Sequence, residues 1–133
     1  MTFNVGTNYE APPRQGNIEV RWPTPTAGQN VRVSQSGCFY SIGQKTLSVP
    51  AAGGDYTITA VGYSDNNACE GPLQDGCTWT AVSSASWVTV LNPGRHGGLD
   101  YLFIRVSANA TGLTRTATIT VHDQILRIEQ AAR

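Results

Sequence analysis

The sequence predicts an all-β protein whose antiparallel strands form two packed sheets. Short runs alternate apolar and polar residues with the period of two that is typical of a strand with one buried face. Turn residues separate these runs at intervals of roughly 8–12 residues, as in sandwiches and barrels. Lysine occurs only at Lys45, whereas threonine, serine, valine and glycine are abundant, a composition typical of structural or extracellular β proteins. No segment shows a sustained helical period, so two layers of sheet are expected.

The alternating runs give the expected strands in chain order. Two of them lie near the N-terminus, at residues 17–22 and 30–34. The others are expected at residues 39–42, 46–49, 56–61, 78–82, 87–91, 101–108, 116–122 and 124–129. Glycine, proline, asparagine or aspartate mark the turns at residues 51–55, 92–94, 96–98, 110–112 and 122–123.

The end of the chain repeats its beginning. Residues 5–8 (VGTN), Arg14, Ile18 and Val20 recur 101 positions later, and residues 31–35 (VRVSQ) recur 95 positions later as residues 126–130 (LRIEQ). The offset between the two copies is 101 up to Val20 and 95 from Val31 onward. The copies therefore differ in length only in the turn between these two strands. An internal repeat constrains the architecture more than any single residue does. The sequence therefore predicts a complete unit at residues 38–133 and the C-terminal strands of a preceding unit at residues 1–37.

The repeat places residues 5–8 at the end of a third strand, so residues 1–37 would hold three strands, and these would expose an apolar face without the rest of their sandwich. The side chains that then need a partner surface are Phe3, Val5, Ile18, Val20, Val31 and Val33. They could pack on the complete unit, swap with a second molecule, or complete a neighbour by strand donation. The last two outcomes would make the chain a homo-oligomer, and a monomer with this segment disordered is the remaining alternative.

Charge and hydropathy argue against several classes of partner. Nine basic and nine acidic residues balance, so the chain has no net field that would attract nucleic acid or an anionic membrane. No apolar run reaches the ~20 residues that span a bilayer, so membrane insertion is not expected. The N-terminal residues lack the basic and apolar regions of a signal peptide.

The three cysteines allow one disulfide and leave one thiol over, a count that favours an oxidising compartment. A bond between Cys69 and Cys77 would close the long loop that follows Tyr63. A bond between Cys38 and Cys77 would instead tie the first strand of the complete unit to its middle and close a longer loop. The sequence leaves both pairings open, together with three reduced thiols.

The long loop also gathers side-chain oxygens of the kind that calcium prefers, from Asp65, Asn67, Glu70 and Asp75. Their spacing matches no dedicated calcium loop, so no metal site is predicted and the four residues are weak candidates. No serine stands in a Gly-x-Ser-x-Gly turn, and nothing singles out a carboxylate pair for glycoside hydrolysis. The chain is therefore expected to be no enzyme and to need no cofactor.

Several spaced motifs follow one another in the order of a known family. They are residues 38–40 (CFY), 77–81 (CTWTA), 86–88 (SWV), Asn109, Arg115 and 128–130 (IEQ), and over residues 38–132 the chain resembles the BACON-type domain. The resemblance implies an immunoglobulin-like antiparallel β-sandwich, with residues 1–37 as the end of a preceding BACON-like unit in a tandem array. BACON-type domains occur beside carbohydrate-active enzymes and proteases in secreted bacterial proteins and in some phage proteins. A secreted or cell-surface protein that binds glycan or mucin is implied.

A glycan site needs exposed aromatic rings, because the C–H faces of sugars stack on them. Trp79 and Trp87 lie within strand patterns and are expected in the core. Trp22, Tyr63 and Tyr101 are therefore the predicted glycan-binding residues. Two functions follow. The chain is either a non-catalytic adhesion or carbohydrate-binding accessory module, or a structural spacer or fibre-forming subunit that assembles by strand exchange through its N-terminal strands.

Overall fold

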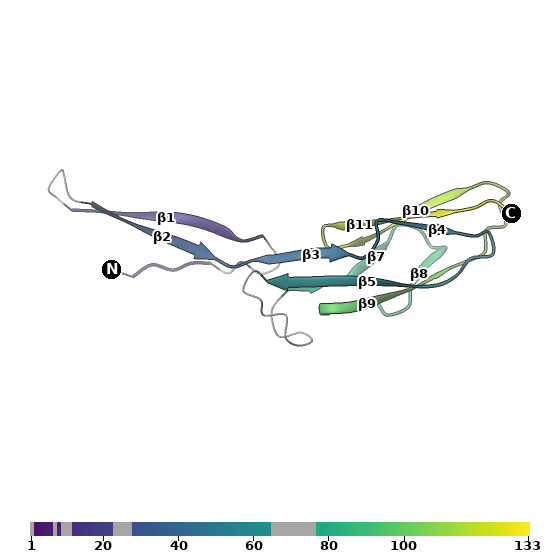
Figure 1. Cartoon of the computed structure of the whole chain (residues 1–133), viewed down its shortest axis with the longest axis horizontal. Helices are drawn as coiled ribbons and strands as arrows, with labels where there is room; N and C mark the ends of the chain where they lie inside the picture. Colours follow the sequence, from purple (N-terminus) through teal and green to yellow (C-terminus); the bar gives the residue numbers. More distant parts are fainter. Residues whose placement is uncertain (1, 7, 9–11, 23–27, 65–76) are drawn as a thin grey trace.

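The computed structural model is all-β and describes residues 2–6, 8, 12–22, 28–64 and 77–133. A two-stranded hairpin, β1 (Arg14–Arg21) and β2 (Gly28–Gln35), extends from one end of a sandwich of two sheets (Figure 1). Only Ser36 and Gly37 separate β2 from the first strand of the sandwich. Within the described residues, no helix has the length and apolar character to cross a membrane.

The sandwich begins at Cys38 and consists of two sheets. The first sheet contains, in spatial order, β4 (Thr46–Val49), β11 (Gln124–Gln130), β10 (Arg115–Val121) and β7 (Ala81–Ser83). The second contains β3 (Cys38–Ile42), β5 (Gly54–Ser64), β9 (His96–Val106) and β6 (Thr78–Trp79), and β8 (Val88–Val90) pairs with the C-terminal part of β9. The prediction of an all-β sandwich is confirmed.

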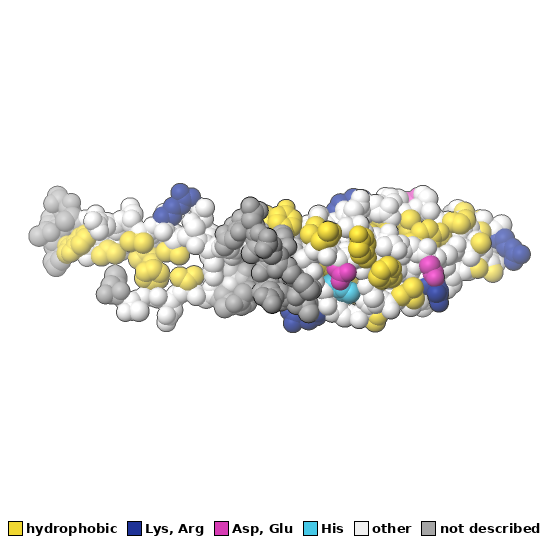
Figure 2. All heavy atoms as spheres, turned by 60° about the horizontal axis from the view of Figure 1, so that its bottom comes forward, with side chains coloured by type: hydrophobic (Ala, Val, Ile, Leu, Met, Phe, Trp, Pro, Cys, Tyr) yellow, Lys and Arg dark blue, Asp and Glu magenta, His cyan; other side chains and the backbone are white. Residues whose placement is uncertain are grey.

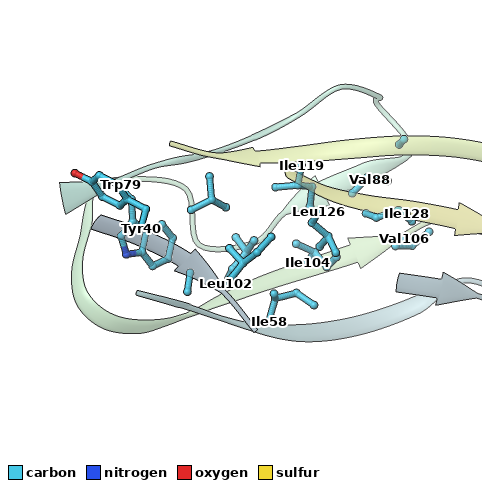
Figure 3. Packing of buried hydrophobic residues seen from close by; sticks show 14 of the residues in the cluster. Tyr40, Ile58, Trp79, Val88, Leu102, Ile104, Val106, Ile119, Leu126 and Ile128 are labelled. Atoms are coloured by element: carbon cyan, nitrogen blue, oxygen red, sulfur yellow. The ribbon is translucent and has the colours of Figure 1, made fainter. Parts of the chain in front are cut away.

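The core lies between the two sheets, because each strand turns alternate side chains inward. Ile119, Leu126 and Ile128 of the first sheet face Ile58, Leu102 and Ile104 of the second (Figure 3). All six are at most 2% exposed. Trp79 is equally buried and Trp87 packs against the core, so the prediction that both are core residues is correct. Close-packed burial of this kind is the main source of stability in a domain of this size.

One pair of strands departs from the expected antiparallel arrangement. β4 lies parallel to β11, with Leu47 opposite Ile128. The chain leaves β3 in the second sheet, crosses to the first sheet through residues 43–45 and continues in the same direction as β4 (Figure 1). It therefore reaches the edge of β11 running the same way as that strand. Alternation alone cannot reveal such a change of sheet.

Two boundary predictions are wrong for related reasons. The strand expected at residues 78–82 is two strands, because the chain passes from one sheet to the other at Thr80 and leaves Thr78 and Trp79 both buried. The turn expected at residues 96–98 is the start of β9, where Gly97 and Gly98 pair with β6 and β5. Glycines were taken as turn residues there, whereas they lie within a paired strand.

The turn expected at residues 51–55 is confirmed at residues 51–53, where it requires a glycine, whereas Gly54 and Asp55 already belong to β5. Gly53 has φ +74°, and a Cβ atom at this position would lie 2.1 Å from the carbonyl oxygen of Val106. The main chain can approach β9 this closely only without a side chain. The turn between β4 and β5 is therefore held against the end of β9.

A disulfide joins Cys38 of β3 to Cys77, whose Cα atoms lie 5.4 Å apart. Of the two pairings that the sequence left open, the structure contains the one that ties the first strand of the sandwich to its middle. Cys69 lies outside the described residues, as do the weak metal candidates Asp65, Asn67, Glu70 and Asp75.

A buried polar corner closes the sandwich where β9, β10 and β11 meet. The amide of Gln130 donates to the carbonyl oxygens of Pro50, Ala51 and Ser107, and its own oxygen accepts from Arg115 Nε at 2.8 Å. Arg115 also donates to the carbonyl oxygen of Ser107. Asn109 is 1% exposed and donates to the carbonyl oxygens of residues 113 and 131. These bonds satisfy polar groups that could not be buried without a partner.

The N-terminal residues form two strands and not three. Residues 2–6 run without strand pairing, whereas β1 and β2 pair over their full length. In the sandwich the corresponding residues 103–107 lie mainly in β9, which pairs with both β5 and β8. Nothing in the described chain supplies such neighbours to residues 2–6.

Candidate ligand-binding face

The outer surface of the second sheet is apolar where a solvated sheet would be polar. Its outward side chains include Phe39 of β3, Tyr63 of β5 and three residues of β9, namely Leu99, Tyr101 and Phe103. We call these five residues the aromatic face. Their exposed fractions range from 39% to 67%. An exposed apolar patch of this kind on a soluble domain is typical of a binding surface.

The aromatic face follows from the strand pattern of β9. Along residues 99–104, Leu102 and Ile104 point into the core while Leu99, Tyr101 and Phe103 point outward. β9 is therefore apolar on both sides. Its neighbour β5 places Thr59 opposite Tyr101 and Thr57 opposite Phe103. Small polar residues thus flank each ring without covering it.

The rings lie in order along the sheet. Phe39 and Tyr63 stack with centroids 5.5 Å apart, and Tyr101 and Phe103 are tilted neighbours at 6.5 Å. Leu99 lies beside Val61, between these two pairs in the strand register. Figure 2 shows hydrophobic side chains in a row across this part of the surface. Among the described residues, these side chains thus form a row along the outer surface of the sheet.

A pair of opposite charges bounds one end of the row. Arg105 donates to both carboxylate oxygens of Asp55, at 2.7 and 2.8 Å, and both side chains are more than half exposed. The hydrogen bond from Arg105 lowers the pKa of Asp55, and the same pairing raises the pKa of Arg105. The pair therefore stays ionised at neutral pH and offers hydrogen bonds beside the rings.

A polar network behind the face fixes the backbone of β9. Asn92 donates to the carbonyl oxygen of Tyr101 at 2.8 Å and accepts from the N–H of Phe103 at 2.9 Å, so it continues the pairing of β8 beyond its last residue. His96 stacks on the buried Trp79 with centroids 4.5 Å apart and contacts Asp100 through Nδ1 at 2.7 Å. Tyr101 and Phe103 are thereby held on a rigid strand.

Asp100 links the His96 side chain to the backbone of Tyr101. Its carboxylate faces His96 and accepts from the N–H of Tyr101 at 2.7 Å. The contact with His96, followed by the backbone hydrogen bond, lowers the pKa of Asp100. The carboxylate is therefore ionised over the whole physiological range and helps to hold Tyr101 in place.

The three predicted glycan-binding residues do not lie together. Tyr63 and Tyr101 belong to the aromatic face, on neighbouring strands of one sheet. Trp22 is 47% exposed but follows β1, which ends on the side of the hairpin away from the sandwich (Figure 1). It therefore belongs to a different surface.

Sequence reasoning missed Phe39, Leu99 and Phe103. The signal was present, because residues 99–104 are apolar at five of six positions and so too apolar for a strand with one solvated face. A strand of this kind is either buried on both faces or exposes a binding surface.

Within the described residues, no group of three His, Cys, Asp or Glu side chains could hold a metal ion.

Comparison with known proteins agrees with this fold. The family model described as "BACON: Putative binding domain, N-terminal" matches residues 78–131, which contain β6 to β11. A solved structure, the Bacteroides ovatus GH5 xyloglucanase in complex with a XXXG heptasaccharide, is similar with a TM-score of 0.56 and 26% identity. The similarity covers 71% of this chain and 19% of that one. No curated protein matches the chain. The family match confirms, over residues 78–131, the resemblance to the BACON-type domain that the sequence motifs indicate.

Proposed function

We propose that the chain is a non-catalytic, extracellular accessory module that binds glycan through the aromatic face. The observation that carries the proposal is the row of exposed rings on one rigid sheet, from Phe39 and Tyr63 to Tyr101 and Phe103. Rings in a flat row suit an extended polysaccharide, because successive sugars can each place a C–H face on a ring. The Asp55–Arg105 pair and the threonines of β5 supply hydrogen-bonding groups for sugar hydroxyls.

The comparisons support the chemistry of this ligand. The matching family is described as a binding domain, and the similar solved structure is a xyloglucanase with a bound oligosaccharide. This chain corresponds to about a fifth of that enzyme's chain, so the enzyme's activity is not transferred with the similarity. A module of an extracellular carbohydrate-active protein is the role that fits both.

Affinity gel electrophoresis with soluble polysaccharides, including xyloglucan and mucin, tests the proposal. We expect at least one polysaccharide to retard the chain. Tyr101→Ala and Phe103→Ala should each weaken that retardation about tenfold or more, because loss of an aromatic hot-spot residue at the centre of a binding surface costs about 2 kcal/mol. Ile125→Ala is the matched control, since Ile125 is an exposed apolar residue of the other sheet, at 55% exposure.

The outcome that contradicts the proposal is equally definite. If no polysaccharide of the panel retards the chain, or if Ile125→Ala weakens retardation as much as Tyr101→Ala, the aromatic face is not a glycan site. Circular dichroism of each variant would show that the fold is retained. Trp22→Ala in the same gels distinguishes binding at the aromatic face from binding at the end of the hairpin. We expect this substitution to leave the retardation unchanged.

A structural spacer is the second candidate, and the end-to-end arrangement of the chain supports it. The hairpin and the sandwich follow one another along a line with only Ser36 and Gly37 between their strands (Figure 1). Asn8 also donates to the carbonyl oxygen of Ser36 at 3.0 Å, so the connection is bonded to the residues that precede the hairpin. Small-angle scattering measures the maximum dimension of the chain. A dimension that stays constant as the salt concentration varies would favour the spacer function, provided that the chain binds no polysaccharide.

A further inference from the structure

The N-terminal hairpin contains a polar corner of its own. Arg14 Nε donates to Gln35 Oε1 at 2.7 Å, and Arg14 Nη2 donates to the carbonyl oxygen of Gly6 at 2.9 Å. Gln35 Nε2 donates to that same carbonyl oxygen at 2.6 Å. Asn8 donates to the carbonyl oxygens of Pro12 and Ser36, at 2.8 and 3.0 Å.

This corner reproduces five of the hydrogen bonds of the polar corner of the sandwich. Arg14, Gln35 and Asn8 occupy the positions of Arg115, Gln130 and Asn109, and the acceptor Gly6 occupies that of Ser107. The acceptors of Asn8, residues 12 and 36, correspond to residues 113 and 131, the acceptors of Asn109. Five equivalent hydrogen bonds between six equivalent residues do not arise from turn chemistry alone.

The strand register agrees as well. Ile18 lies opposite Val31 and Gly16 opposite Val33 in the hairpin, as Ile119 lies opposite Leu126 and Ala117 opposite Ile128 in the sandwich. β1 and β2 are therefore the structural counterparts of β10 and β11. The hairpin has the local geometry of the C-terminal part of a sandwich.

The two copies differ in what covers their apolar side. Ile104, Val106 and Leu126 are at most 2% exposed, whereas their counterparts Phe3, Val5 and Val31 are 52%, 48% and 43% exposed. A groove of about 360 Å³ lies on this side of the hairpin, lined by Phe3, Val5, Ile18 and Val33 among others. Three large apolar side chains that the sandwich buries are thus open to solvent in the hairpin.

The sandwich indicates what covers such a side. β4 lies parallel along the outer edge of β11, and the carbonyl oxygens of Pro50 and Ala51 accept from Gln130. In the described chain, Gln35 Nε2 donates to Gly6 and has no counterparts of those two acceptors. The counterpart of β4, at the edge of β2, is likewise missing from the described residues.

We propose that the apolar side of the hairpin binds a polypeptide segment similar to residues 38–102, which is the front part of a BACON-like domain. Thr2 corresponds to Phe103 at the offset of 101, so this segment is the part that the hairpin lacks. The bound segment places one strand parallel to β2, gives Gln35 two further carbonyl acceptors, and fills the groove with apolar side chains. The hairpin and the segment together make one sandwich.

A second copy of the chain is a poorer occupant. Its own residues 38–102 are already packed against its own β10 and β11. Its hairpin could offer only another open apolar side, with no acceptors placed for Gln35. The face therefore favours the missing part of a sandwich over a self-paired hairpin.

Amide hydrogen exchange tests the proposal on the whole chain and on a lengthened chain that carries residues 38–102 a second time, directly before Thr2. In the lengthened chain we expect exchange in β1 and β2 to slow about 100-fold or more, because these strands join a cooperatively folded core. The same sample contains its own reference, since β10 and β11 should remain as protected as in the original chain.

A matched pair of substitutions identifies the face involved. Val33→Glu in the lengthened chain should abolish the added protection, because Val33 corresponds to the buried Ile128. Ser34→Glu should leave it intact, since Ser34 is exposed and its counterpart is Glu129. Unchanged exchange of β1 and β2 in the lengthened chain would overturn the proposal, as would equal effects of the two substitutions.

Two measurements on the original chain apply even if the lengthened chain does not fold. Light scattering should give a monomer, and Val33→Glu should leave the unfolding transition of the sandwich unchanged. A dimer whose β1 and β2 amides are protected would show that a second copy covers the face. Loss of sandwich stability in Val33→Glu would show that the chain's own sandwich covers it. Either result would overturn the proposal.

Discussion

Gln130 is a polar side chain that is 1% exposed, and its amide joins three segments of the sandwich. It bonds to the turn after β4, to the end of β9 and to Arg115 of β10. Arg115 in turn lies over the ring of Trp87, with its guanidinium carbon 4.2 Å from the ring centroid. A buried amide with all its partners holds these segments in one arrangement, because any other packing would leave its polar atoms unpaired.

Gln130→Ala should therefore lower the free energy of unfolding by about 2–3 kcal/mol, since it leaves buried carbonyl oxygens without a donor. The matched variant Gln35→Ala removes the counterpart in the hairpin and should change the unfolding of the sandwich by less than about 0.5 kcal/mol. Urea unfolding followed by tryptophan fluorescence measures both. Equal losses would mean that the hairpin and the sandwich unfold as one unit.

Asp100 makes stability depend on pH in a defined direction. Its pKa is lowered in the folded state from an ordinary value of 3.8, chiefly by the contact with His96. A carboxylate whose pKa is lower in the folded state stabilises the fold fully when the pH is above its pKa in the unfolded state. This stabilisation is lost as the pH falls through its pKa in the folded state. Asp100→Asn should thus reduce the difference in unfolding free energy between neutral pH and about pH 3. A variant with the same acid profile as the original chain would contradict this assignment.

At the scale of the elements, the disulfide fixes the start of the sandwich. It joins β3 to Cys77, just before β6, across a sequence separation of 39 residues. In the chain-entropy description, closing a loop of this length stabilises the fold by about 4 kcal/mol. β3 lies at an edge of its sheet, where β5 is its one partner among the described strands, so a covalent bond secures an edge strand.

The double variant Cys38→Ala, Cys77→Ala should lower the free energy of unfolding by about 2–5 kcal/mol. Cys69→Ala is the control, because the disulfide does not include Cys69, and it should leave the unfolding midpoint unchanged. Denaturant unfolding with and without a reducing agent measures the difference. A loss in Cys69→Ala as large as that in the double variant would contradict the pairing.

The sequence predicts a strand correctly where one face of the strand is buried and the other is exposed. The prediction is wrong where both faces are buried or where the strand begins with glycine. Alternation located β5, β10 and β11 because each turns a polar side to solvent. It could not show that the chain changes sheet at Thr80, where Thr78 and Trp79 are both buried. The predicted strand begins later than β9 does, because the glycines at the start of β9 indicate a turn. In the structure these glycines pair with other strands.

The candidate face was only half predictable. The sequence singles out Tyr63 and Tyr101 because aromatic rings suit sugars, but it does not single out their neighbours Phe39 and Phe103. Which side of a strand faces solvent depends on the sheet that covers it, and one sequence does not give this. The cysteine pairing was also undecided, because it depends on where the start of β3 lies relative to the start of β6.

At the scale of the whole molecule, the chain presents two unlike apolar surfaces. The aromatic face lies on a complete and rigid sandwich and is flanked by charged and hydroxyl groups. The apolar side of the hairpin carries Phe3 and aliphatic residues that correspond to buried core residues, with a polar corner set for further backbone partners. The first surface suits a polysaccharide and the second a polypeptide, so the two proposed ligands need not compete for one site.

The central claim is that the aromatic face binds glycan, and an amide chemical-shift titration of the whole chain tests it most directly. The titrant is an oligosaccharide cut from whichever polysaccharide retards the chain, with a XXXG heptasaccharide as the first choice. The account predicts that the shifts concentrate in β3, β5 and β9 around Phe39, Tyr101 and Phe103, with β10 and β11 unchanged. Shifts confined to the other sheet or to the hairpin, or no shifts with any oligosaccharide, would contradict it.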